Sequence, residues 1–133
     1  MASILVIDDD PAILGVAELL LRRDGHNVVV ARKAKEGVRT LERDPVDLVI
    51  VDIFMPEMDG LETINEVRRL RPGLPVIVMS GYQFEAAGSP RPDFLHMASA
   101  LGATSSLQKP FRPAELVQAV TRCLARQAGR AAG

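Results

Sequence analysis

The stretch Ile4-Leu5-Val6-Ile7-Asp8-Asp9-Asp10 joins a short run of apolar residues to three consecutive aspartates. Runs of the same kind recur at residues 28–31, 48–51 and 76–79, and a weaker fifth run surrounds Leu107. Apolar residues are continuous in these runs and do not alternate with polar ones, which is typical of strands covered by helices on both faces. The runs therefore predict the strands of a parallel sheet.

Between the runs, apolar residues recur at the spacing of a helix. The stripes are formed by Ile13, Ala17, Leu20 and Leu21, by Ala34, Val38 and Leu41, by Leu61, Ile64, Val67 and Leu70, and by Leu116, Val120, Cys123 and Leu124. The third helix is expected to open at Asp59 and to stop before Pro72, and the last helix to begin behind Pro113. This alternation of strands and helices predicts an α/β domain of five βα units.

The fourth helix has the weakest pattern. Gly88, Pro90 and Pro92 interrupt helical hydrogen bonding in this part of the chain. We therefore expect a long loop over residues 81–92 and a short helix over residues 93–101.

The composition is that of one soluble globular domain. Among 133 residues, 47% are hydrophobic and 25% are charged, and the formal net charge is −1. A dedicated nucleic-acid binder has a marked basic excess, so no direct binding to nucleic acid is expected. No stretch approaches the roughly 20 apolar residues of a membrane-spanning helix, and the single Cys123 excludes an internal disulfide. We expect a cytoplasmic domain over residues 1–126 and a short flexible tail over residues 127–133.

Polar side chains follow four of the apolar runs, where the predicted strands end. They are Asp8 and Asp9 after the first run, Asp52 after the third, Ser80 after the fourth and Lys109 after the fifth. The carboxyl ends of parallel strands meet at the edge of the sheet where α/β proteins bind ligands. Clustered carboxylates hold Mg²⁺, and an ammonium group neutralises phosphoryl oxygens. The pattern therefore predicts a site for a divalent cation and a phosphoryl group.

Each of these residues also has a structural interpretation. Aspartates at this position can cap a helix, and Asp10 is expected to act mainly as the cap because Pro11 follows it. Taken alone, Asp52 fits a turn and Ser80 fits a loop. Lys109 is more specific, because the chain uses thirteen arginines and three lysines. A lysine before the last helix indicates that a compact ammonium is required there.

Four segments together resemble the receiver domain of two-component response regulators, single-domain chemotaxis regulators included. They are residues 4–11, residues 52–60 (DIFMPEMDG), residues 78–81 (VMSG) and residues 102–111, which end in Lys109-Pro110-Phe111. The segments occur in the family's order, and the resemblance covers essentially the whole chain. It implies a flavodoxin-like, doubly wound (βα)5 fold with a five-stranded parallel sheet in the order 2-1-3-4-5.

The resemblance also implies roles for the acidic residues. Asp52 matches the aspartate that takes a phosphoryl group from a phosphohistidine on a sensor histidine kinase or a histidine phosphotransfer protein. Asp8 and Asp9 match the acidic pair that binds Mg²⁺, with Asp52 and the backbone carbonyl of Phe54 as further ligands. A signalling domain that phosphorylates itself, without turnover of a separate substrate, is expected.

The residues that sense the phosphoryl group match the family only in part. Ser80 matches the hydroxyl residue that hydrogen-bonds the acyl phosphate, and Lys109 matches the lysine that pairs with it. Three residues before the lysine, typical receivers have a Tyr or Phe that swings inward on phosphorylation, and this chain has Ser106. The segment from Ser80 to Gly102 is also longer than usual. The resemblance therefore implies an atypical switch.

Two other functions fit part of the pattern. A phosphatase of the haloacid dehalogenase type would use Asp8, but it leaves Asp52 without a role and needs an acidic pair after Lys109, which the chain lacks. A receiver-like binding module that works without phosphorylation fits Ser106 and the long loop. No output domain follows the last predicted helix, so the chain either signals by protein contact or belongs to a longer regulator.

The remaining candidate residues have simpler interpretations. His26 and His96 lack the neighbours of a ligand histidine and are expected to have surface or packing roles. Cys123 lies on an apolar stripe and is expected to be a buried thiol. Arg122, Arg126 and Arg130 recur at four-residue spacing, which indicates a solvated helix face, with docking of an acidic partner as the alternative.

Overall fold

The structure is a computed structural model that describes residues 2–53, 60–80 and 102–132. In chain order, its elements are β1 (Ser3–Ile7), α1 (Pro11–Arg23), β2 (Asn27–Ala31), α2 (Ala34–Arg43), β3 (Leu48–Asp52), α3 (Gly60–Leu70), β4 (Val76–Ser80), β5 (Ser105–Gln108) and α6 (Pro113–Ala132). The predicted strands are confirmed, and β1 to β4 are each one residue longer than expected. The predicted loop 81–92, the helix 93–101 and the expected helix start at Asp59 lie outside the described residues.

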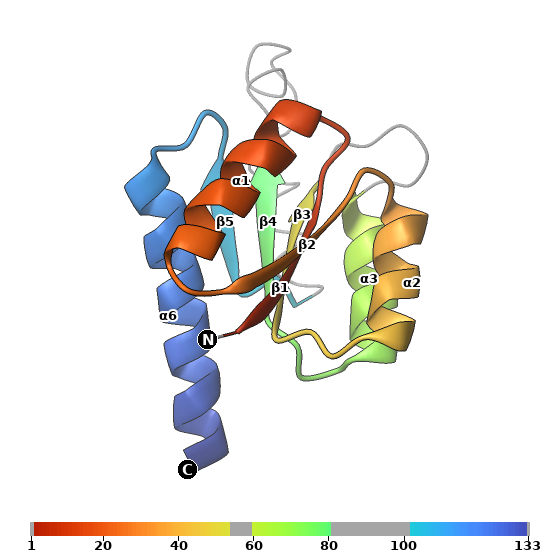
Figure 1. Cartoon of the computed structure of the whole chain (residues 1–133). Coiled ribbons are helices and arrows are strands. Elements are labelled where there is room, and N and C mark those ends of the chain that lie inside the picture. Colours follow the sequence, from red (N-terminus) through yellow and green to blue (C-terminus); the bar gives the residue numbers. More distant parts are fainter. Residues whose placement is uncertain (1, 54–59, 81–101, 133) are drawn as a thin grey trace.

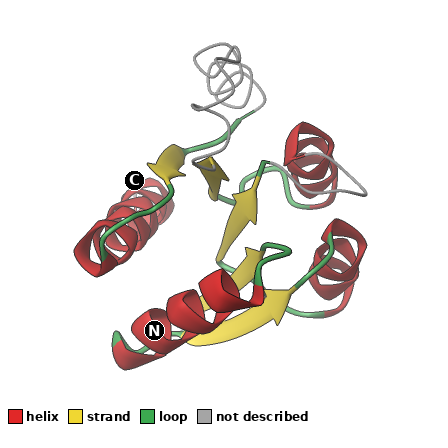
Figure 2. Cartoon of the chain, turned by 90° about the horizontal axis from the view of Figure 1, so that it is seen from above, coloured by secondary structure: helices red, strands yellow, loops and turns green. Residues whose placement is uncertain are grey.

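The five strands form one parallel sheet in the order β2-β1-β3-β4-β5. Helices α1 and α6 lie on one face of the sheet, and α2 and α3 lie on the other (Figures 1 and 2). The predicted flavodoxin-like architecture and strand order are confirmed. Because all strands run in one direction, their carboxyl ends lie along a single edge of the sheet.

The core is divided into two layers by the sheet. In β1, Ile4 and Val6 pack in the layer that includes α1 and α6, while Leu5 and Ile7 pack in the layer of α2 and α3. Successive side chains of a strand point to opposite faces, so a strand covered on both sides must be apolar at every position. Every residue of β3 and β4 is buried, including Asp52 and Ser80 at their carboxyl ends.

The start of α1 follows directly from the residues after β1. Asp10 is the N-cap, its side chain accepts a hydrogen bond from the backbone N–H of Ala12, and Pro11 is in the first turn. These are the residues that helix starts prefer. The expected capping role of Asp10 is thereby confirmed, and it ties the acidic segment to a rigid helix.

Helix α6 runs further than the sequence indicated. It extends to Ala132, so residues for which we expected a flexible tail belong to the helix. This segment contains three alanines, the best helix formers, and its single internal glycine does not end the helix. The domain boundary at residue 126 stays a prediction. Among the described helices, none combines the length and apolar character needed to cross a membrane.

Candidate functional site

Three aspartates lie together at the carboxyl ends of β1 and β3. Asp8 and Asp9 directly follow β1, and Asp52 is the last residue of β3, the neighbouring strand. One carboxylate oxygen from each residue lies within 4.8 Å of the others. Asp8 and Asp52 are buried, whereas Asp9 is exposed. The structure therefore brings together the three aspartates that the sequence analysis placed at strand ends.

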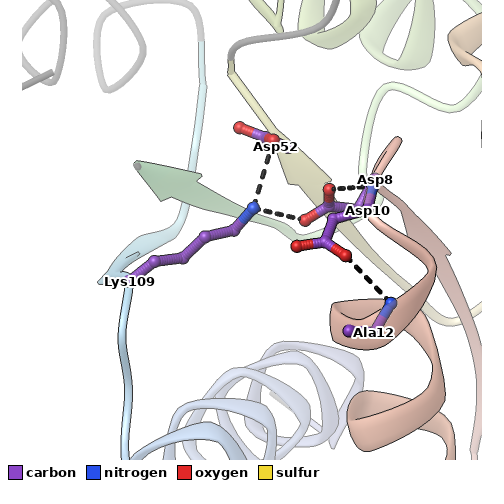
Figure 3. A network of polar contacts seen from close by, with 5 residues as sticks. All are labelled: Asp8, Asp10, Ala12, Asp52 and Lys109. Carbon is purple, nitrogen blue, oxygen red and sulfur yellow. Dashed lines mark hydrogen bonds and ion pairs between the residues drawn. The ribbon is translucent and has the colours of Figure 1, made fainter. Parts of the chain in front are cut away.

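Lys109 follows β5 and extends toward this cluster, so that its ammonium group lies between two carboxylates (Figure 3). Its Nζ atom lies 2.6 Å from Oδ2 of Asp8 and 3.2 Å from Oδ2 of Asp52, to which it donates a hydrogen bond. Two buried carboxylates repel each other unless a positive charge lies between them. Lys109 supplies that charge.

The pKa of Lys109 lies above its ordinary value. Burial lowers this pKa because an ammonium is poorly solvated in the interior, but the contacts with Asp8 and Asp52 together raise it by more. The ion pair thus stabilises the fold up to the ordinary lysine pKa of about 10.4, and this contribution is lost only as the pH rises through the raised pKa. The lysine is charged throughout the physiological range.

A hydrogen bond from the chain itself orients Asp8. The backbone N–H of Asp10 donates to Oδ1 of Asp8 at 2.9 Å. This contribution of Asp10 was missed in the sequence analysis, although an aspartate commonly accepts from the backbone two residues further on. Oδ2 of Asp8 is buried and has no hydrogen-bond partner among the described residues; its contact there is the ion pair with Lys109.

The acidic cluster fits a magnesium ion. Mg²⁺ prefers carboxylate oxygens and keeps several water molecules. Asp8 offers a fixed, buried oxygen that lacks a hydrogen bond, and the exposed Asp9 places the cluster at the protein surface, where bound water has room. This acidic triad is typical of the Mg²⁺ site expected from the sequence. The predicted fourth ligand, the carbonyl of Phe54, lies outside the described residues.

Ser80 lies on the strand between Asp52 and Lys109. In the sheet, β4 separates β3 from β5, Asp52 pairs with Met79, and Ser80 pairs with the residue before Lys109. The backbone N–H of Lys109 donates to the carbonyl of Ser80 at 2.8 Å. Ser80 is 2% exposed. The backbone therefore holds the serine and the lysine side by side at the edge of the sheet that carries the aspartates.

Ser106 lies in β5, where its register partner is Val78 of β4. It is exposed. The segment between Ser80 and Gly102, the other departure noted in the sequence, lies outside the described residues.

Two minor predictions are confirmed. Cys123 is a buried free thiol, and its burial raises the thiol pKa more than the nearby Arg126 lowers it. His26 has a packing role, since its Nδ1 accepts a hydrogen bond from the backbone of Ala2 and its Nε2 lies 3.4 Å from Asp24. His96 lies outside the described residues.

The family model described as "Response regulator receiver domain" matches residues 4–121. The chain belongs to this family. It is a receiver domain of two-component signalling, which is a signalling module and not a turnover enzyme. The phosphatase alternative, which left Asp52 without a role, is therefore set aside.

Curated relatives differ in length from this chain. The "Transcriptional regulatory protein GlrR" of Escherichia coli (strain K12) is 39% identical over 127 residues, which are 96% of this chain and 27% of that protein. An uncharacterized 14.6 kDa protein of Leptolyngbya boryana is 39% identical over 126 residues, which are 92% of this chain and 91% of that protein. The chain thus spans about a quarter of the first relative and nearly all of the second.

Solved receiver structures superpose closely on the fold. A CheY-like response regulator receiver domain protein from Methanospirillum hungatei has a TM-score of 0.87 at 30% identity, covering 98% of both chains. A receiver domain protein from Clostridium thermocellum has a TM-score of 0.85 at 32% identity, covering 96% of this chain and 98% of that one.

Proposed function

We propose that this receiver domain takes a phosphoryl group from a phosphohistidine onto Asp52 and signals through contact with other proteins. The observation that carries the proposal is the position of Asp52, whose buried carboxylate shares one cluster with Asp8 and Asp9 and contacts Lys109. A carboxylate becomes a useful acceptor for a phosphoryl group where fixed positive charge offsets the charge that arrives.

In the proposed reaction, an oxygen of Asp52 attacks the phosphorus of the donor. The new bond is the O–P bond of an acyl phosphate, the bond that breaks is the P–N bond of the phosphohistidine, and the imidazole leaves. Lys109 pairs with the phosphoryl oxygens, and the hydroxyl of Ser80 donates a hydrogen bond to them. Ser80 ends β4, the strand next to that of Asp52, and Lys109 follows β5 and contacts the Asp52 carboxylate.

Asp8, Asp9, Asp52 and the carbonyl of Phe54 would hold Mg²⁺. The ion supplies charge neutralisation when bound. The chain's own contribution is to fix the ligands, since Asp8 is held by the backbone of Asp10 and Asp52 by the β3 ladder. The carboxylates of Asp8 and Asp52 also contact one ammonium group, that of Lys109.

The expected phosphodonor is a sensor histidine kinase or a histidine phosphotransfer protein, acting in the cytoplasm. GlrR is named a transcriptional regulatory protein, and that description applies to a protein nearly four times as long as the matched segment. For this chain we propose signalling by protein contact through an atypical switch. Ser106 is small and exposed, so no ring at that position follows the movement of Ser80.

A phosphorylation-independent binding module is the second candidate, and the exposed Ser106 favours it. Mass spectrometry of the intact chain after incubation with a small phosphodonor separates the two. The phosphoacceptor function predicts a stable adduct of one phosphoryl group that requires Mg²⁺ and is suppressed by a chelator. An unmodified chain under both conditions would reject it and leave the binding module. Phosphotransfer profiling against purified kinases then identifies the donor.

A further inference from the structure

A polar pocket lies at the opposite end of the sheet from Asp52. It has a volume of about 360 Å³ and lies where β4 and β5 begin, between residues 72–75, residues 102–104 and the helix α6. The strands run from this pocket to the phosphorylation site, since β4 ends at Ser80 and β5 is followed by Lys109. The pocket is therefore separate from the aspartate cluster.

Two arginines from different helices line this pocket. Arg68 comes from α3 and Arg126 from α6, and both are exposed. No aspartate or glutamate is among the lining residues, and within the described parts of the chain neither arginine forms an ion pair. By contrast, the neighbouring Arg69 pairs with Glu66 at 2.7 Å. The pocket thus gathers two positive charges without a described acidic partner.

The side chain of Arg68 passes close to the backbone at Gly102. Gly102 has a φ of 111°, and a Cβ atom there would lie 2.7 Å from both Cδ and Cζ of Arg68. The arginine therefore occupies the space that a side chain at position 102 would fill. The absence of a side chain at Gly102 thus leaves room for the Arg68 side chain at the wall of the pocket.

The rest of the lining adds a donor and an apolar wall. The hydroxyl oxygen of Thr104 accepts a hydrogen bond from the backbone N–H of Val76, so its O–H group is left to donate. Pro72, Leu74 and Pro75 line the same pocket. The pocket therefore offers polar contacts to an anionic group and apolar contacts to a small organic group.

We infer that this pocket binds a small organic phosphate, with the phosphate between Arg68 and Arg126 and the organic part against residues 72–75. Guanidinium groups bind phosphate through paired N–H···O hydrogen bonds. Small-molecule pockets measure roughly 300 to 1,000 Å³, so this one suits a small ligand. The site goes beyond the phosphoacceptor function and does not depend on it, because it shares no residue with the aspartate cluster.

The test is an NMR titration of the ¹⁵N-labelled chain with phenyl phosphate, without Mg²⁺, and with inorganic phosphate in a parallel series. We expect saturable shifts of the amides of residues 102–104, and tighter binding of phenyl phosphate than of inorganic phosphate. Equal affinity for phenyl phosphate and inorganic phosphate would show that the pocket recognises only the phosphate group, and would overturn the proposal of an organic ligand. Shifts confined to Asp9 and Ile53 would show binding at the aspartate cluster and also overturn it.

Matched variants decide whether the arginines act as ligands. Arg68→Gln and Arg126→Gln should each weaken phenyl phosphate binding by about tenfold or more, because a charged hydrogen-bond donor is lost. Arg69→Gln and Arg122→Gln, which remove charges outside the lining, should bind as the parent does. An equal loss in all four variants would indicate general electrostatic attraction and contradict the proposal. Thermal unfolding of each variant verifies the fold.

Discussion

The ammonium nitrogen of Lys109 lies 2.6 Å from Oδ2 of Asp8. This oxygen is buried and has no described hydrogen-bond partner, which makes it the oxygen best suited to a cation. The lysine and a divalent ion therefore compete for the same negative charge. In the proposed reaction this competition is resolved, because Lys109 pairs with the phosphoryl oxygens once the phosphoryl group has been transferred.

This relationship predicts that Lys109→Met binds Mg²⁺ more tightly than the parent chain, by about three- to tenfold, since a nearby positive charge is removed. The same variant should be less stable without Mg²⁺ by about 3 kcal/mol, because a buried carboxylate loses its partner. Isothermal titration measures the affinity and thermal unfolding measures the stability. Lys35→Met, at an exposed position of α2, is the control and should change neither. Unchanged or weaker Mg²⁺ binding by Lys109→Met would refute the competition.

The two neighbouring aspartates should behave differently when substituted. Asp9→Ala is expected to abolish measurable Mg²⁺ binding and to lower phosphorylation sharply, because one of few anionic ligands is lost. Asp10→Asn should keep both properties, since asparagine caps a helix as well as aspartate does and the backbone N–H that holds Asp8 is unchanged. Titration of both variants with Mg²⁺ tests this. Loss of binding in Asp10→Asn would mean that Asp10 is a ligand and not mainly a cap.

Substitution of alanine for two different glycines should change the stability of the fold in opposite directions. Gly102→Ala is expected to destabilise the fold by about 1 to 2 kcal/mol, because alanine is strained at the positive φ of this position. Gly15→Ala, in α1 with nothing within 4 Å of the added atom, should stabilise by about 0.5 to 1 kcal/mol. Denaturant unfolding gives both values. A neutral Gly102→Ala would contradict the positive φ at this position.

The thiol of Cys123 should react slowly in the folded chain. Burial raises the pKa of this thiol, so the native state favours its protonated form. The resulting contribution to the stability of the fold is present below the ordinary thiol pKa of about 8.5. It is lost as the pH rises through the raised pKa. We expect iodoacetamide to modify the native chain far more slowly than the urea-unfolded chain at pH 7. The native rate should continue to rise with pH beyond the point where the unfolded rate levels off. Equal profiles in the two states would show an accessible thiol.

Much of the fold was predictable because β1, β3 and β4 are buried on both faces, so their residues are apolar except at the strand ends. The prediction of which helix residues are buried was less accurate. Val38 was expected in the core of α2 and is only partly buried, whereas Gly37 faces the sheet. The reason is a contact from a distant strand, since a Cβ at position 37 would lie 2.7 Å from Cγ1 of Ile7.

The candidate site was predictable as a set of residues but not as a geometry. Parallel strands bring Asp8, Asp52 and Lys109 to one edge, and strand order alone implies that they meet. The sequence does not show that Lys109 lies closer to Asp8 than to Asp52, because side-chain direction depends on packing. The spacing of Arg122, Arg126 and Arg130 marked a basic helix face, but the sequence did not show that Arg68 lines a pocket with Arg126, because that lining comes from four separate segments.

The central claim is that Asp52 is the phosphoacceptor, and site-resolved mass spectrometry tests it most directly. The parent chain and Asp52→Asn are incubated with Mg²⁺ and a small phosphodonor and then digested, and thermal unfolding confirms that both are folded. We predict one phosphoryl group on the peptide that contains Asp52 in the parent, and none anywhere in Asp52→Asn, which keeps the shape of the side chain but removes the nucleophile. Undiminished phosphorylation of Asp52→Asn at Asp8 or any other residue would contradict the account.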